Sequence, residues 1–147
     1  MARGFELKAV REVAALRALQ ETAARTRVDG AGRAVRRVET LQAAERARQN
    51  ERETAWTHSL AADGFEMSTL WSAAILGGET ELTGLSVRRA DAEVGLESAR
   101  ADWRVASARA GAAEDLAKAT VRRVSRAREE RALAEVADRA ARKGGRR

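Results

Sequence analysis

The sequence contains no cysteine and no proline. The absence of cysteine excludes disulfides and thiolate metal sites, which fits a reducing compartment. The absence of proline means that nothing forbids helices of many turns. Aromatic residues make up only 3% of the 147 residues, whereas 34% are charged. This composition, rich in alanine, arginine, glutamate and leucine, is typical of long helices and coiled coils rather than of a globular core.

Long apolar runs are also missing. The longest mostly apolar stretch, about a dozen residues around Leu70, is too short to span a bilayer. The N-terminal residues carry charges every few positions and lack an apolar run of signal-peptide length. We therefore expect a soluble, cytoplasmic protein.

Residues for catalysis or metal binding are scarce as well. His58 is the only histidine, so a zinc site built from several histidines cannot be assembled, and we find no Ser-His-Asp constellation around it. The segment "LGGETELTG" lacks the lysine and the spacing of a phosphate-binding loop. Adjacent carboxylates such as Glu129 and Glu130 are most simply explained as solvated helix faces. We expect no enzymatic activity, no metal and no cofactor.

Charge is distributed unevenly along the chain. Residues 1–58 carry a net charge of +4, residues 59–117 carry −5, and residues 118–147 carry +7. Arg122, Arg123 and Arg126 cluster in the last of these regions. Such a cluster can bind nucleic acid or a membrane surface, but acidic residues interleave with the arginines and no DNA-binding motif is visible. A protein partner is the favoured interpretation.

The strongest pattern is a three-four spacing that begins at Leu82 and is sustained for more than six heptads. Such spacing predicts a coiled-coil seam. After Ala127 the phase shifts, and Leu133, Val136 and Ala140 continue a different helical face, as at a stutter. The predicted seam residues are Leu82, Leu85, Arg89, Ala92, Leu96, Ala99, Trp103, Ala106, Ala110, Ala113, Ala117, Thr120, Val124 and Ala127.

The first half shows a looser apolar stripe, which favours one long helix from about Glu6 to about Leu60. Gly30 and Gly32 are its weak point, at a cost of roughly 1 kcal/mol each relative to alanine. A break there would allow a three-helix bundle instead. The stripe consists of Leu7, Val10, Val13, Leu16, Leu19, Val28, Ala31, Val35, Val38 and Leu41.

Neither helix can bury its stripe alone, so we expect the two to pair as an antiparallel hairpin. A turn near Leu70 and Trp71 makes the numbers of facing residues add to about 142. The apolar residues from Val28 to Leu41 then meet the small residues from Ala99 to Ala113. The same register sets Gly30 and Gly32 opposite Gly111, where the backbones would approach closely.

The apolar cluster in the middle of the sequence becomes the tip of this hairpin. The segment "DGFEMSTLWSAAIL" is expected to form a short helix capped near Asp63, with Gly77 and Gly78 as its stop. Its large side chains either plug the end of the coil, together with Trp56, or form a docking patch for a partner. The candidate partner-binding residues are Phe65, Leu70, Trp71, Ile75, Arg122, Arg123 and Arg126.

The predicted fold is all-α, a long antiparallel two-helix coiled-coil hairpin with a short helical apolar tip, forming a single domain over residues 1–147. The first helix is expected at about 6–60, the tip at 61–81, the second helix at 82–142 and a basic tail at 143–147. A monomeric hairpin is favoured over a homodimer through the alanine seam.

Three features of the chain resemble the FliJ/YscO family of type III export proteins, which are small basic coiled-coil hairpins. These features are Phe5 and Leu7 followed by "VREV", an irregular centre, and an arginine-rich last helix containing "REERALAEVADRAA". The likeness spans nearly the whole chain. It contains no short motif from which a functional residue of the family could be assigned to this sequence.

The resemblance implies a non-enzymatic, cytoplasmic component of the flagellar or injectisome export apparatus. It would act as a stalk-like coiled coil that contacts the hexameric export ATPase and the export gate, and it could handle export chaperones. It would reach the inner face of the cell membrane only through these partners. The alternatives are a general adaptor or structural coiled coil, or a basic helical nucleic-acid-binding protein.

Overall fold

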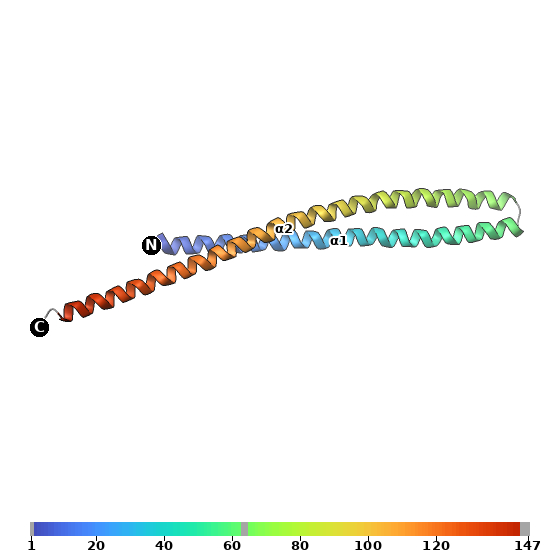
Figure 1. The fold of residues 1–147 in the computed structure, drawn as a ribbon. Coiled ribbons are helices and arrows are strands. Elements are labelled where there is room, and N and C mark those ends of the chain that lie inside the picture. The colour runs from blue at the N-terminus through green and yellow to red at the C-terminus, as the bar shows by residue number, and fades with distance from the viewer. Residues whose placement is uncertain (1, 63–64, 145–147) are drawn as a thin grey trace. The chain divides into compact units, whose positions relative to one another are not determined.

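A computed structural model describes residues 2–62 and 65–144, and the side chains from Glu6 to Ala62 and from Glu66 to Arg142. These residues form two α-helices, α1 (Ala2–Ala62) and α2 (Phe65–Gly144), which run antiparallel to each other (Figure 1). The described ranges contain no strand. The predicted all-α two-helix hairpin is therefore confirmed.

The chain divides into two units, each of which pairs a segment of α1 with a segment of α2. Unit 1 combines residues 1–24 with residues 103–147, and unit 2 comprises residues 25–102. Unit 2 therefore contains the end of α1 and the start of α2.

Both helices are continuous through their glycines. Gly30 and Gly32 lie within the 61 residues of α1, so the alternative of a break at this point is wrong. Gly77 and Gly78 lie within the 80 residues of α2, so the predicted helix stop is also wrong. There is no separate tip helix in the described ranges, because residues 65–76 of the segment that was expected to form it make the first turns of α2. The cap expected near Asp63 lies outside the described residues. Strong helix formers on both sides offset the low helix propensity of glycine.

The three-four spacing of α2 corresponds to a buried seam, as predicted. Every predicted seam residue from Leu82 to Ala127 is buried or half-buried. Leu85 and Thr120 are the most enclosed of them, each with 5% of its surface exposed. The same spacing continues toward the start of α2, where the additional seam residues are Ser68, Trp71, Ile75 and Gly78.

The seam of α1 differs from the predicted apolar stripe. Val13, Leu16, Leu19 and Leu41 are exposed, so their prediction as core residues is wrong. The helix keeps a strict heptad and buries whatever residue occupies the facing position, polar residues included. The observed seam consists of Leu7, Val10, Ala14, Arg17, Glu21 and Ala24 in unit 1, and of Val28, Ala31, Val35, Val38, Gln42, Glu45, Gln49, Arg52, Trp56 and Ser59 in unit 2.

Side-chain contacts between the helices fix the register within each unit. Arg89 forms an ion pair with Glu39 at 3.1 Å, and Gln42 donates a hydrogen bond to Ser86 at 3.3 Å, both in unit 2. Arg123 pairs with Glu6 in unit 1. The numbers of these partners add to 128 or 129, not to about 142, because α2 begins earlier than expected.

Two predictions that depended on the earlier register are therefore wrong. In the observed register, Val35 and Val38 lie at the level of residues 90–93 of α2 and not of the Ala99–Ala113 segment, whose start is reached only by Val28. The glycines do not create a close backbone approach. A Cβ atom at Gly111 would meet nothing within 4 Å, and one at Gly30 would meet only Arg33 of its own helix.

Candidate partner-binding surfaces

The start of α2 in unit 2 divides the predicted apolar cluster into two sets. Trp71 and Ile75 occupy seam positions and are half-buried, whereas Leu70 has 65% of its surface exposed. The side chain of Phe65 lies outside the described part of the chain. Leu70 precedes Trp71 by one residue, which turns it about 100° around the helix and away from the seam. Three of the predicted docking residues have described side chains in this segment, and among them Leu70 is the one that faces solvent.

Other large aliphatic side chains near the same end of unit 2 are also exposed, although they were not among the predicted partner-binding residues. They are Leu60 of α1 and Met67 and Leu76 of α2, with exposed fractions of 53%, 42% and 63%. Extending the three-four spacing from Leu82 toward the start of α2 would have identified Leu70 and Leu76 as off-seam residues. We call Leu60, Met67, Leu70 and Leu76 the turn-end patch.

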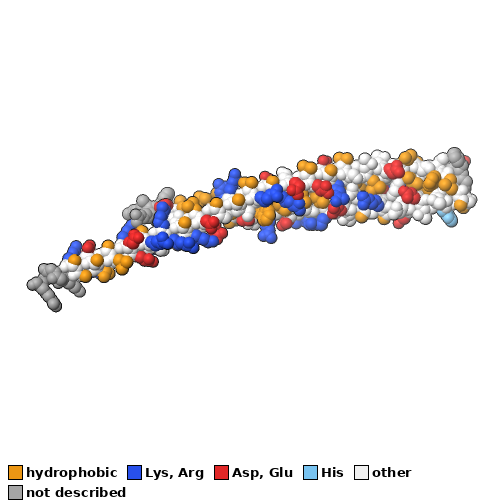
Figure 2. Space-filling view, viewed as in Figure 1, with side chains coloured by type: hydrophobic (Ala, Val, Ile, Leu, Met, Phe, Trp, Pro, Cys, Tyr) orange, Lys and Arg blue, Asp and Glu red, His pale blue; other side chains and the backbone are white. Residues whose placement is uncertain are grey.

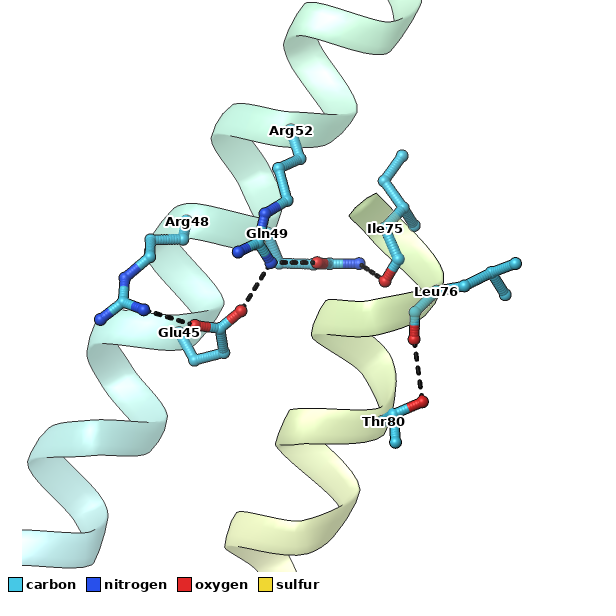
Figure 3. Close-up of polar contacts among 7 residues, drawn as sticks. All are labelled: Glu45, Arg48, Gln49, Arg52, Ile75, Leu76 and Thr80. Atoms are coloured by element: carbon cyan, nitrogen blue, oxygen red, sulfur yellow. Dashed lines mark hydrogen bonds and ion pairs between the residues drawn. The ribbon is translucent and has the colours of Figure 1, made fainter. Parts of the chain in front are cut away.

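A polar layer interrupts the seam next to this end of unit 2 (Figure 3). The Glu45 side chain is almost fully buried, and its two carboxylate oxygens accept hydrogen bonds from Arg48 at 3.0 Å and Arg52 at 2.6 Å. Arg52 also donates to the Gln49 side chain at 3.3 Å. Gln49 in turn donates across the seam to the backbone carbonyl oxygen of Ile75 at 3.0 Å. The apolar stripe predicted for the first helix ends at Leu41, so it does not include this layer.

Gly78 makes room for the layer. A Cβ atom at this position would collide with the Oε1 atom of Gln49 and with a guanidinium nitrogen of Arg52. A Cβ atom at the neighbouring Gly77 would meet nothing within 4 Å. The glycine at the seam position therefore accommodates the two polar side chains that cross toward α2.

The predicted arginine cluster lies in unit 1, on α2. Arg122 and Arg126 are exposed and form no ion pair with any described residue, whereas Arg123 pairs with Glu6. Basic side chains gather along this part of the molecule in Figure 2. A shallow hollow of about 410 Å³ lies over the cluster and is lined by Ala119, Arg122, Arg123, Arg126, Ala127 and Glu130.

Beyond the arginine cluster, α2 continues with no described neighbour. Every residue from Arg128 to Arg142 is exposed, including Leu133 at 70% and Val136 at 61%. Hydrophobic side chains are visible on the surface of this segment in Figure 2. We call residues 128–142 the free segment. The predicted change of phase after Ala127 coincides with the point where burial ends.

The remaining candidates for site chemistry are few. His58 is exposed, and no group of three potential metal ligands occurs among the described residues. In unit 1, a hydrogen bond and the positive charge of Lys118 lower the pKa of Glu114, and the pKa of Lys118 is raised in return. Both groups are fully exposed, so this is an ordinary surface ion pair.

No helix in the described ranges is both long enough and apolar enough to cross a bilayer. No family model matches the chain, and neither does any curated protein or solved structure. The geometry of the surfaces is therefore the basis for a functional proposal.

Proposed function

We propose that this chain is a non-enzymatic coiled-coil component of a flagellar or related type III export apparatus, working in the cytoplasm. In this proposal, unit 1 contacts the hexameric export ATPase and the turn-end patch contacts the export gate. Export chaperones are further candidate partners of the exposed surface. The resemblance in sequence suggests this system, and the observation that carries the proposal is the free segment of α2 with the arginine cluster directly before it.

The free segment supports a protein contact in unit 1 because a single helix in water has no other way to cover an apolar face. Isolated helices depend on packing for most of their stability. Arg122 and Arg126 have no acidic partner among the described residues, so their charge is available to an acidic surface. An interface in this region would bury Leu133 and Val136 and would pair the two arginines.

The turn-end patch supports a second contact. Four large aliphatic side chains are exposed near one end of unit 2, and a concentration of exposed apolar groups commonly marks a partner surface. The patch does not include Trp71 and Ile75, which are half-buried in the seam between the helices. A partner would therefore bind without opening the coiled coil.

The test is the hydrolysis rate of the export ATPase from the same organism, with and without this protein, at two salt concentrations. We expect stimulation that is lost in the Arg122→Glu/Arg126→Glu variant. Arg123 is left unchanged because reversing it would also break the ion pair with Glu6. The matched control is Arg104→Glu/Arg109→Glu, which changes the same charge at exposed positions of unit 1 that have no ion pair with a described residue.

Equal loss of stimulation in both variants would mean that only net charge matters and would contradict a specific contact. Absence of stimulation and of binding at low salt would contradict the export proposal as a whole. Binding to DNA or RNA that weakens steeply with salt would instead favour the nucleic-acid alternative.

A further inference from the structure

A second group of arginines lies in unit 2 and is separate in sequence from both surfaces used above. Arg33, Arg36 and Arg37 fall within about one turn of α1, outside the seam, and all three are exposed. Their guanidinium groups form no ion pair or hydrogen bond with any described residue. By contrast, Arg48, Arg52 and Arg89 of the same unit all pair with glutamates. Three neighbouring positive charges in this group are therefore uncompensated within the described chain.

Two of these arginines fold back over glycines of α1. The Nη2 atom of Arg33 lies 3.9 Å from where a Cβ atom of Gly30 would stand, and the Nη1 atom of Arg36 lies 3.6 Å from that of Gly32. The two guanidinium groups therefore lie back along the helix, at distances where a Cβ atom would only touch them. Each glycine costs the helix roughly 1 kcal/mol relative to alanine.

A hollow of about 530 Å³ adjoins the group and is lined by Arg33, Arg36, Arg37, Thr40 and Leu41. Leu41 is 51% exposed although it is a large aliphatic residue. The aliphatic stems of the arginines add apolar surface, while their planar ends remain free to pair with anions. The surface thus joins concentrated positive charge to an exposed apolar side chain.

We propose that this surface binds a carboxylate-rich, amphipathic segment of a partner protein. A guanidinium group pairs with a carboxylate through two parallel hydrogen bonds, and three guanidinium groups within one turn suit glutamates on successive turns of a helix. Leu41 would receive an apolar residue of the same segment. A nucleic acid fits less well, because the patch has no aromatic residue on which bases stack.

The inference is independent of the export proposal, since the patch shares no residue with the arginine cluster of unit 1 or with the turn-end patch. It is tested with a fluorescein-labelled peptide in which the sequence Glu-Leu-Leu-Glu-Glu is repeated three times. Binding to the full chain is followed by fluorescence anisotropy. A labelled single-stranded oligonucleotide of equal charge is measured in parallel.

We expect the Arg33→Glu/Arg36→Glu/Arg37→Glu variant to bind the peptide at least about tenfold more weakly than the unchanged protein. The control is Arg27→Glu/Arg46→Glu/Arg88→Glu, which makes the same charge change at exposed positions of unit 2 that have no ion pair with a described residue. It should retain nearly all of the affinity. Equal losses in the two variants, or tighter binding of the oligonucleotide than of the peptide, would overturn the proposal.

A further variant separates binding from folding. Gly32→Glu places a carboxylate four residues before Arg36, an arrangement that forms a favourable ion pair within a helix. We expect this variant to be more stable to urea and yet to bind the peptide several-fold more weakly, because Arg36 is occupied. Unchanged affinity in a folded Gly32→Glu protein would contradict the role assigned to Arg36.

Discussion

Gln49 of α1 occupies the space that a side chain at position 78 of α2 would need. Its Nε2 atom donates to the carbonyl oxygen of Ile75, and its Oε1 atom lies over the bare Cα of Gly78. The seam of unit 2 is therefore fixed at this level by a polar side chain that fits a glycine. A polar residue at a core position commonly specifies register at some cost in stability.

The two adjacent glycines of α2 should respond differently to alanine. Gly77→Ala meets no neighbour within 4 Å, so it should raise the free energy of unfolding by up to about 1 kcal/mol. Gly78→Ala should not raise the free energy of unfolding, because its Cβ atom displaces Gln49 and Arg52 from their hydrogen bonds. Urea denaturation followed by circular dichroism measures both variants.

A double-mutant cycle with Gln49→Ala tests the cause of this difference. We expect Gly78→Ala to be less harmful when Gln49 is already absent, with a coupling energy of about 1 kcal/mol. Additive effects in this cycle would show that Gln49 and Gly78 do not interact.

The buried carboxylate of Glu45 should be strongly coupled to Arg52 and weakly coupled to Arg48. Glu45→Ala leaves the half-buried Arg52 without its carboxylate partner, which should cost about 2 kcal/mol or more. Arg48→Ala should cost less than about 0.5 kcal/mol, because the Arg48 side chain is 56% exposed. The melting temperatures of the two variants provide the comparison.

Replacing both members of the buried pair should have a different effect from removing one. Glu45→Leu/Arg52→Leu should come within about 1 kcal/mol of the unchanged protein or exceed its stability, since apolar residues often substitute well for a buried ion pair. A double variant less stable than Glu45→Ala would contradict this view of the layer.

The indole N–H of Trp103 is a buried donor without an acceptor among the described residues. Its Nε1 atom has no hydrogen-bond partner in the described chain, and such a group costs about 1–3 kcal/mol. Trp103→Phe keeps most of the packing and removes the donor, so its stability should stay within about 1 kcal/mol of the unchanged protein. Trp103→Ala should lose about 2 kcal/mol or more. Equal losses in both variants would mean that the indole N–H is well paired.

The turn-end patch should be separable from the seam by mutation. Leu70→Ser/Leu76→Ser should abolish binding to the export gate while the melting temperature stays nearly constant, since both leucines are largely exposed. Trp71→Ser should lower the melting temperature, because Trp71 lies in the seam. The control Val87→Ser/Val94→Ser removes two other exposed apolar side chains of unit 2 and should leave binding intact.

A large loss of stability in Leu70→Ser/Leu76→Ser would instead indicate that the patch holds the end of unit 2 together. Binding that survives in this variant would contradict the assignment of the patch to the gate.

Much of the fold follows from spacing alone. The seam of α2 from Leu82 to Ala127 was predicted residue by residue, because a heptad repeat is a strong periodic signal. The residues of α1 that face this seam were not predicted correctly, because a heptad repeat matches itself after every shift of seven residues. The expected register differs from the observed one by roughly two heptads, which leaves every seam position facing inward.

Residue type was a poorer guide than spacing in α1. Leu16, Leu19 and Leu41 were predicted to be buried because they are apolar, but the strict heptad passes through Arg17, Glu21 and Gln42 instead. Two helices with long side chains can bury aliphatic stems and satisfy polar groups across the seam. In the turn-end patch, Leu70 was predicted as a docking residue, whereas Leu60, Met67 and Leu76 were not, because the docking residues were chosen by hydrophobicity and not by register.

The exposed surfaces proposed for binding all depend on the register, so cysteine cross-linking within unit 2 is the most direct test. The natural sequence has no cysteine, so each engineered pair is unambiguous. We predict that Gln42→Cys/Leu85→Cys forms an intramolecular disulfide on mild oxidation, because these seam residues lie at the level of the Gln42–Ser86 hydrogen bond. Gln42→Cys/Ala99→Cys, which matches a turn near Leu70, should not cross-link. Efficient cross-linking of the second pair and not the first would contradict the account.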